Sequence, residues 1–351
     1  MPGAPAPHHD GPSAADRAIR DRRATVASVL GALRRLAMAP SLGEVSFAGR
    51  GFAVEATEST RRLEAIPQAV VCGFEWGIED RDPADTERRL AMVDPEVRGF
   101  AYEGATMACV IRDAMGPNGH RARTLMEGGG RPHVFLNYIG IGFAMARLPR
   151  PLWRKAVPAP TGPGHYPAMS WLAVDGYGFD RAYFDTGRWI DAQRVPRAYP
   201  WEGDPDYFLR AVDQGIGRAL WFVHGGRADR VCAAVRAFAD RRRADLWSGV
   251  ALAATFAGGS TPAGLAALRH EAGEDRGHVA QGSVFAAKAR HHAGHVPEHT
   301  RVATRALAGL DVEAAAELAD DCAVTRTGAG GPPAYELWRR SVRERLTSTV
   351  V

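Results

Sequence analysis

A glycine-centred segment recurs along this chain and constrains its fold more than any other feature. Successive copies are separated by 31, 36, 36, 39, 34, 33 and 40 residues. This period is typical of solenoids built from helical hairpins, and it differs from the periods of propellers and leucine-rich repeats. The copies are VVCGFEWG (Gly73), AYEGATMA (Gly104), NYIGIGFA (Gly140), AVDGYGFD (Gly176), VDQGIGRA (Gly215), LWSGVALA (Gly249), VAQGSVFA (Gly282) and LADDCAVT, in which Cys322 replaces the glycine.

The residues around each glycine follow helical spacing. A bulky residue usually stands three positions after the glycine and a small one four positions after it, which places all three on one helix face. Glycine inside a helix costs about 1 kcal/mol relative to alanine. Its recurrence therefore indicates that neighbouring helices approach closely at these points. The bulky residues are Trp76, Met107, Phe143, Phe179, Leu252 and Phe285.

Each unit is expected to have a second, shorter helix. Glycines precede the segments 228–238, 261–268 and 297–307, and Pro262 and Pro297 stand near two of the expected first turns. Alternation typical of strands is scarce. We therefore predict an all-α fold, a solenoid or closed toroid of helical hairpins that is similar to tetratricopeptide arrays in period only. We expect one domain over residues 25–347, preceded by a disordered tail over residues 1–24.

Composition is ordinary for a globular protein, and charge excludes few partners. The 351 residues are 46% hydrophobic and 24% charged, which allows a sizeable core. The net charge is +4, but basic side chains are scattered among 40 acidic ones, which argues against nucleic-acid binding. The four cysteines lie far apart, and neither a signal peptide nor a long apolar run is visible. We expect a cytoplasmic protein.

The position directly before the glycine is polar in most copies. Such a column would follow one face of the repeat, and it either faces solvent or lines a groove that positions a ligand. In the second interpretation its acids, with Asp180 close by, are the candidate catalytic residues, namely Glu103, Asp175 and Asp180. The full column reads Cys72, Glu103, Ile139, Asp175, Gln214, Ser248, Gln281 and Asp321.

The three aspartates of AVDGYGFDRAYFD cannot share one ion. Asp175, Asp180 and Asp185 are five residues apart, which separates them by about 140° around a helix. Asp180, Arg181 and the later Arg218 are better explained as inter-repeat salt bridges than as catalytic groups.

Aromatic residues are frequent on or beside the long helices. They either pack in the core or form the wall of a groove for an extended apolar ligand. The groove interpretation predicts a ligand-binding set that combines the polar column with neighbouring aromatic residues, namely Glu103, Tyr138, Asp175, Tyr177, Gln214, Trp247 and Gln281.

No cofactor or metal is expected. The Gly-x-Gly pairs at 140/142, 176/178 and 215/217 lack the third glycine and the preceding strand of a dinucleotide-binding motif. The four histidines His291, His292, His295 and His299 are the best metal candidates, but Gly294 and Pro297 interrupt their helix. We predict neither a metal site nor flavin, haem or an iron–sulfur cluster.

Several long segments together resemble the UnbL-type family, which is found in actinobacterial gene clusters for enediyne and related polyketide biosynthesis. The resemblance covers about residues 26 to 327. It rests on RRLAMAPSLGEVSFAGRGF, RRLEAIPQAVVCGFEWGIE, RGFAYEGATMA, FLNYIGIGFAMARLPRPLW, SWLAVDGYGFDRAYFDTGRWI and AVDQGIGRALWFVHGG.

The resemblance implies a biosynthetic context but supplies no catalytic residue. It implies action on a linear polyene from an iterative polyketide synthase during formation of an enediyne core. It also implies partners from the same gene cassette, one of them membrane-embedded, which would bring the protein to a membrane. Two hypotheses stay open: an enzyme or enzyme subunit that binds the polyene, and a non-catalytic scaffold that docks partner enzymes.

Overall fold

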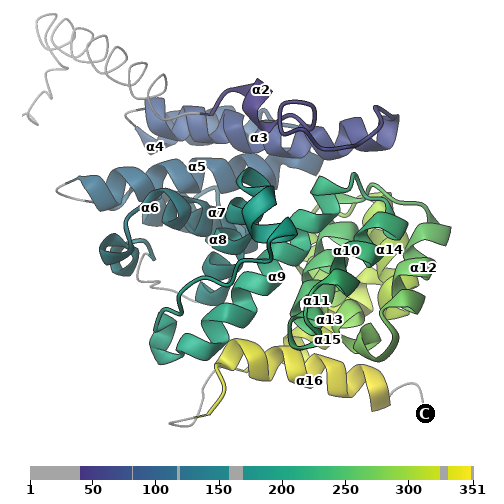
Figure 1. The fold of residues 1–351 in the computed structure, drawn as a ribbon. Coiled ribbons are helices and arrows are strands. Elements are labelled where there is room, and N and C mark those ends of the chain that lie inside the picture. The colour runs from purple at the N-terminus through teal and green to yellow at the C-terminus, as the bar shows by residue number, and fades with distance from the viewer. Residues whose placement is uncertain (1–39, 81, 117–118, 158–168, 325–330, 349–351) are drawn as a thin grey trace, which may run out of the picture.

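The computed structural model describes residues 40–80, 82–116, 119–157, 169–324 and 331–348, and these residues form helices without any strand (Figure 1). The all-α prediction is thus confirmed. The α-helices are α2 (Leu42–Val45), α3 (Glu58–Glu79), α4 (Pro83–Ala91), α5 (Pro95–Met115), α6 (Arg121–Glu127), α7 (Val134–Arg147), α8 (Ser170–Phe184), α9 (Pro205–Val223), α10 (Ala228–Ala237), α11 (Asp240–Ala257), α12 (Pro262–Glu271), α13 (Arg276–His292), α14 (Glu298–Ala308), α15 (Val312–Asp321) and α16 (Ala334–Ser348). Shorter helical turns are η1 (Arg131–His133), η2 (Arg150–Lys155), η3 (Gly187–Asp191), η4 (Trp201–Gly203) and η5 (Gly273–Asp275).

Several helices start at a capping side chain followed by proline. Asp94 accepts a hydrogen bond from the backbone N–H of Glu96 and precedes Pro95, and Asp204 caps α9 in the same way before Pro205. The cap satisfies a free N–H group of the first turn, where proline loses nothing because its missing N–H would have no helical partner. Sequence therefore sets the starts of α5 and α9 locally.

The long helices α3, α5, α7, α8, α9, α11 and α13 pack on one another in chain order and run in the same direction. Near their C-terminal ends, an arginine of one helix donates to a carbonyl near the end of the preceding helix. Arg112 donates to Gly77 over 2.7 Å, Arg181 to Ala146 over 2.7 Å, and Arg290 to Phe256 over 2.6 Å. Parallel neighbours bring equivalent positions of successive copies together.

The recurring glycines lie where these helices touch. A Cβ added at Gly140 would come closer than 3.0 Å to the carbonyl oxygen of Glu103, which is the residue before Gly104. The same clash, with the carbonyl before the preceding glycine, occurs at Gly176, Gly215, Gly249 and Gly282. We call this line of contacts the glycine seam. Close approach of backbones is therefore the reason for the repeat.

The second glycine of each Gly-x-Gly pair faces the opposite neighbour. A Cβ at Gly142 would clash with the Ala173 carbonyl on α8, and one at Gly178 would clash with Val212 on α9. Gly217 meets Leu246 of α11 in the same manner. These pairs let α7, α8 and α9 approach the helices on both sides, so packing and not phosphate binding explains them.

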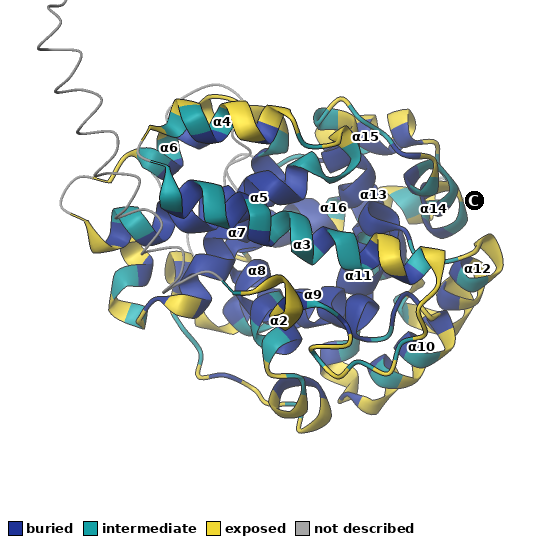
Figure 2. Cartoon of the chain, turned by 90° about the horizontal axis from the view of Figure 1, so that it is seen from above, coloured by how far each residue is buried: buried dark blue, intermediate teal, exposed yellow. Residues whose placement is uncertain are grey.

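The last long helix returns to the first ones. Arg290 of α13 donates to the carbonyl of Glu96 in α5 over 2.7 Å, and the rings of His292 and Phe135 of α7 lie 5.7 Å apart. Helix α3 covers one end of this arrangement and α16 the other, as Figures 1 and 2 show. Most side chains between these two covers are therefore buried.

The predicted second helices are confirmed in the later units as α10, α12 and α14, which pack side by side at one edge. In earlier units the connection is more varied: α4 and α6 follow α3 and α5, whereas η2 and the η3–η4 segment follow α7 and α8. The predicted tail over residues 1–24 lies outside the described residues. Among those described, no helix combines the length and apolarity needed to cross a membrane.

Candidate functional site

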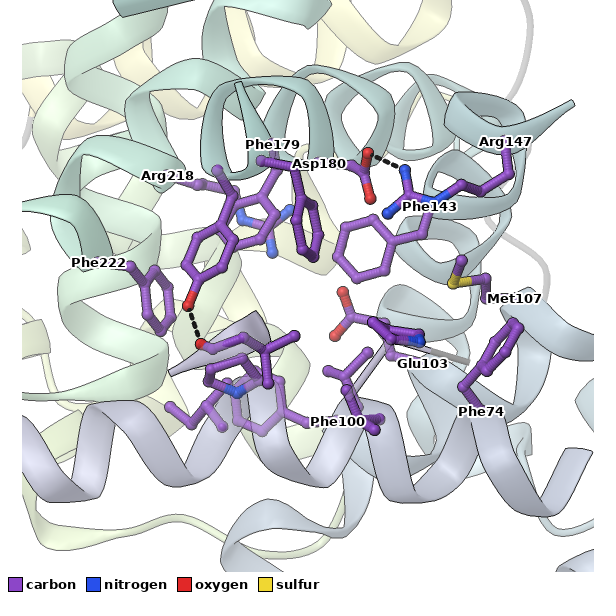
Figure 3. Close-up of a pocket in the computed structure, with 18 residues that line it drawn as sticks. Phe74, Phe100, Glu103, Met107, Phe143, Arg147, Phe179, Asp180, Arg218 and Phe222 are labelled. Carbon is purple, nitrogen blue, oxygen red and sulfur yellow. Dashed lines mark hydrogen bonds and ion pairs between the residues drawn. The ribbon is translucent and has the colours of Figure 1, made fainter. Parts of the chain in front are cut away.

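Two mainly apolar hollows lie between the helices, in the interior of the molecule. The first, which we call the α3-side hollow, has a cavity volume of about 60 Å³ and lies between α3 and the inner faces of α5, α7, α8 and α9 (Figure 3). Most of its wall is aromatic or aliphatic. Its lining residues are Pro40, Val45, Ile66, Pro67, Val70, Val71, Phe74, Phe100, Glu103, Met107, Phe143, Arg147, Phe179, Asp180, Tyr183, Phe184, Arg218 and Phe222.

The second, the α16-side hollow, has a cavity volume of about 40 Å³ and is also mainly apolar. Side chains from α5, α7, α8, α9, α11, α13 and α16 surround it, including Phe256, Phe285, Tyr335 and Trp338. Phe100, Arg218 and Phe222 line both hollows. The two spaces therefore adjoin. Each is smaller than the roughly 300 Å³ at which small-molecule sites begin, so a ligand of more than a few atoms can enter only if the lining side chains move apart.

The wall of the hollows follows the repeat. The bulky residues three positions after the seam glycines supply it: Met107, Phe143 and Phe179 line the α3-side hollow, and Leu252 and Phe285 line the other. In α9 this position is Arg218. An arginine thus stands where the neighbouring helices have apolar side chains. This exception in the repeat was the sequence signal that Arg218 lines the hollows, although from the sequence alone we assigned it only to a salt bridge.

Glu103 is the acidic side chain at the centre of the α3-side hollow. It comes from α5, is 2% exposed, and points its carboxyl into the hollow toward the ring of Phe143 (Figure 3). No hydrogen bond to this carboxyl is made within the described part of the chain. Burial raises its pKa to about 8, against a smaller opposing effect of Arg218. Near neutral pH this group can both hold and release a proton.

Arg218 belongs to a set of hydrogen-bonded side chains where the two hollows adjoin. Its Nη1 donates to Asp175 over 2.5 Å, and Gln214 Nε2 donates to the other oxygen of Asp175 over 2.6 Å. Gln214 Nε2 also donates to Tyr335 Oη over 2.9 Å. The structure therefore joins two predicted residues, Asp175 and Gln214, to Arg218 and to the wall of the α16-side hollow.

Asp180 lies at the edge of the α3-side hollow and is paired. Arg147 of α7 donates to it over 2.5 Å, and Asp180 is 3% exposed. Burial raises the pKa of Asp180, and Arg147 opposes this rise. The predicted inter-repeat salt bridges are confirmed for Asp180 and for Arg218, which pairs with Asp175. The prediction is wrong for Arg181, which within the described ranges donates to the Ala146 carbonyl instead.

The solvent-facing interpretation of the polar column is wrong for its central members. Their exposed fractions are 2% or less, because the position before the seam glycine lies at a helix–helix contact inside the enclosed arrangement. Asp321, at the end of the column, is exposed. The central polar members are Glu103, Asp175, Gln214, Ser248 and Gln281.

Three aromatic residues of the predicted set lie away from both hollows. Tyr177 packs against Trp153, with ring centroids 5.0 Å apart, and Tyr138 is buried with a pKa raised to about 12 by burial. Trp247 is 2% exposed and lines neither space. For these three, core packing describes the contacts.

Gln281 belongs to a polar cluster beneath α16. Its Oε1 accepts from Ser248 over 3.1 Å and from Arg339 Nε over 3.1 Å. Arg339 also donates to Asp245 over 2.7 Å and to Glu336 over 3.2 Å. We call these five residues the α16 cluster. The helix that supplies Arg339 and Glu336 was absent from the predicted site.

A short segment covers the α3-side hollow beside α3. Tyr183 donates its hydroxyl to the carbonyl of Val45 over 2.6 Å, and Arg50 Nη2 donates to Phe184 over 2.5 Å. Both contacts tie the α2 region to the end of α8. No group of three or more His, Cys, Asp or Glu side chains in the described ranges could hold a metal ion.

Comparison with known proteins identifies a family without a known activity. Residues 29–346 match the family described as "Protein of unknown function (DUF1702)". The chain belongs to this family. The match includes α16, which the motif-based resemblance did not reach. No curated protein and no solved structure matches the chain.

Proposed function

We propose that the protein binds, and processes, a linear polyene intermediate of polyketide origin inside its two hollows, as part of enediyne core biosynthesis. The observation that carries this proposal is the pair of adjoining, mainly apolar hollows, which share Phe100, Arg218 and Phe222 and would widen into one site if the side chains between them moved apart. Burial of an extended hydrocarbon there would gain roughly 25 cal/mol per Å² of apolar surface.

The biosynthetic context in this proposal comes from the UnbL-type resemblance of the segments quoted above. Other proteins of the same gene cassette, one of them membrane-embedded, would supply or receive the intermediate. We also infer that the long helices form a closed toroid of repeats, since α13 returns to α5 through Arg290 and to α7 through His292.

A fluorescent long-chain conjugated tetraene fatty acid tests the binding step, because its emission rises in an apolar environment. We expect saturable binding to the purified protein. Val70→Trp would fill the α3-side hollow and weaken binding by about tenfold or more. Gln68→Trp, on the same helix but away from both hollows, is the matched control and should bind like the unchanged protein.

Lack of saturable binding, or equal affinity of the two tryptophan variants, would contradict an internal ligand site. In that case the scaffold hypothesis would be favoured. It predicts that partner proteins co-purify with the protein whether or not the hollows are filled.

A further inference from the structure

Glu103 stands out among the acids around the α3-side hollow. Asp175 accepts hydrogen bonds from Arg218 and Gln214, and Asp180 accepts one from Arg147. Glu103 is as buried as these aspartates, yet within the described ranges its carboxyl accepts no hydrogen bond. Buried polar groups are nearly always paired, so an unpaired carboxyl facing an open space calls for an explanation.

Arg218, which also lines the α3-side hollow, has N–H donors that make no hydrogen bond to the described residues. A guanidinium carries five N–H donors, and only Nη1 of Arg218 is used in a hydrogen bond to another described residue. Asp175, which Gln214 holds through a hydrogen bond, accepts from the guanidinium, and the ring of Phe179 lies 5.1 Å from the central carbon of Arg218. The group is therefore held in place while it lines both hollows.

The Glu103 carboxyl can act as a base or an acid, and the Arg218 guanidinium is a fixed, positively charged hydrogen-bond donor. Both face a space whose wall is mainly apolar. We propose that Glu103 and Arg218 form a proton-transfer site that moves a double bond along a conjugated chain carrying a carbonyl group. This inference rests on the proposed function, because it requires that the hollows hold such a chain.

The step balances without an oxidant, a reductant or a cofactor. The Glu103 carboxylate takes a proton from a carbon next to the carbonyl or conjugated with it, so that a C–H bond breaks and an O–H bond forms. The electron pair moves through the double bonds to the carbonyl oxygen, whose negative charge Arg218 stabilises. Glu103 then returns the proton to another carbon, and an isomer of the starting chain results.

The surroundings suit this chemistry. A general base works best when its pKa lies near the working pH, and the pKa of Glu103 is about 8. Hydrogen bonds to a developing oxyanion are strong where water is excluded. The other charged groups that line the hollow are Arg147 and Asp180, which pair with each other. Next to them, Asp175 pairs with Arg218, and Arg50 donates to the carbonyls of Tyr183 and Phe184.

A long-chain β,γ-unsaturated methyl ketone in D₂O tests the inference directly. The unchanged protein should convert it to the conjugated α,β-unsaturated ketone, seen by ultraviolet absorbance, with deuterium incorporation seen by mass spectrometry. Glu103→Gln should lower the rate about 100-fold or more, and Arg218→Lys should also lower it, because lysine loses the planar donor geometry. Glu317→Gln, at an exposed position of α15, is the control and should keep the full rate.

The pH profile gives a readout that a purely structural role would not produce. Because the carboxylate is the reactive form, kcat/KM should rise with pH and level off above about 8. Competition between the ketone and the tetraene acid measures binding separately.

If the ketone binds but isomerises equally slowly in the unchanged protein and in Glu103→Gln, the proton-transfer site is refuted and the proposed binding function stands. If neither the ketone nor the tetraene acid binds, the proposed function fails, and this inference fails with it.

Discussion

The α3-side hollow and the α16 cluster each contain a polar residue that directly precedes a seam glycine, but only the residue in the α16 cluster accepts hydrogen bonds from the described part of the chain. Glu103 and Gln281 both directly precede a seam glycine, and both are 2% exposed or less. Gln281 accepts hydrogen bonds from Ser248 and Arg339, whereas Glu103 accepts none from the described residues.

The difference comes from the helix that covers each end. Helix α16 brings Arg339 and Glu336 onto the polar positions of α11 and α13. Helix α3 faces Glu103 with apolar side chains, among them Ile66, Val70 and Phe74. A polar position in the repeat thus becomes a structural hydrogen bond or a reactive carboxyl according to what lies across from it.

The largest effect is expected from Arg339→Met, which removes the central partner of the α16 cluster. Burial alone would raise the pKa of Asp245, but Arg339 and Arg210 hold it below its ordinary value. Loss of one partner from a buried ion pair costs about 3–5 kcal/mol, with the lower figure expected because Arg210 stays 2.9 Å from Asp245. Chemical denaturation followed by circular dichroism measures this change.

Arg236→Met is the control for that variant, because its partner Glu271 and Arg236 itself are both exposed. It should change the free energy of unfolding by less than about 1 kcal/mol. Equal losses in the two variants would show that the α16 cluster is no more important than a surface pair.

A smaller loss is expected when the glycine seam itself is disturbed, at its contact between α11 and α13. Gly282→Ala places a methyl group against the Ser248 carbonyl at a distance that real side chains do not adopt. The helices must separate, and we expect a loss of about 2–3 kcal/mol in the free energy of unfolding. Gly277→Ala, on the same helix but with its nearest neighbour 4.0 Å away, should be neutral or stabilise by up to about 1 kcal/mol.

Urea titrations of the two alanine variants settle this comparison. If Gly282→Ala is as stable as Gly277→Ala, close approach is not the reason for the recurring glycines.

The smallest effect, and one of opposite sign, is expected for Glu103→Gln. The folded-state pKa of about 8 lies above the ordinary value of 4.5, so the folded chain keeps a proton that the unfolded chain releases between these values. The stability of the unchanged protein should therefore fall, relative to the variant, as pH rises from about 4.5 to about 8. By pH 8, ionisation costs the unchanged protein roughly 4 kcal/mol, and the unpaired amide of the variant costs roughly 1–3 kcal/mol. At pH 8 the variant should therefore be more stable by about 2 kcal/mol.

Paired denaturation curves at pH 5 and pH 8 check this prediction. A difference that does not change with pH would mean that Glu103 is ionised, and therefore paired, throughout this range.

Much of the interior could be predicted from the repeat, but the functional set only in part. The spacing of glycines and bulky residues predicted the helices, the close contacts and, through Met107, Phe143 and Phe179, the side chains that line the α3-side hollow. Glu103, Asp175 and Gln214 were predicted as one column. Tyr138, Tyr177 and Trp247 were included because they are aromatic, although aromatic character alone does not separate a core residue from a wall residue.

Arg218 is a lining residue that the repeat could have predicted but that we assigned only to a salt bridge. It occupies the position three residues after Gly215, where the other units carry a bulky apolar residue in six cases. An exception at a wall position indicates a polar group directed into the hollow. The salt bridge to Asp175, which we expected, explains one of its nitrogens and leaves the others for a ligand.

By itself, the sequence determined the helices, their seam and the face that each turns to its neighbours, because helical period, capping and glycine contacts act over a few residues. Only the tertiary structure decided which polar positions are paired. That depends on α3 and α16, which meet the repeat from distant parts of the chain, and on the return of α13 to α5. Burial and pairing are properties of these long-range contacts, and they alone separate the unpaired Glu103 from the hydrogen-bonded Gln281.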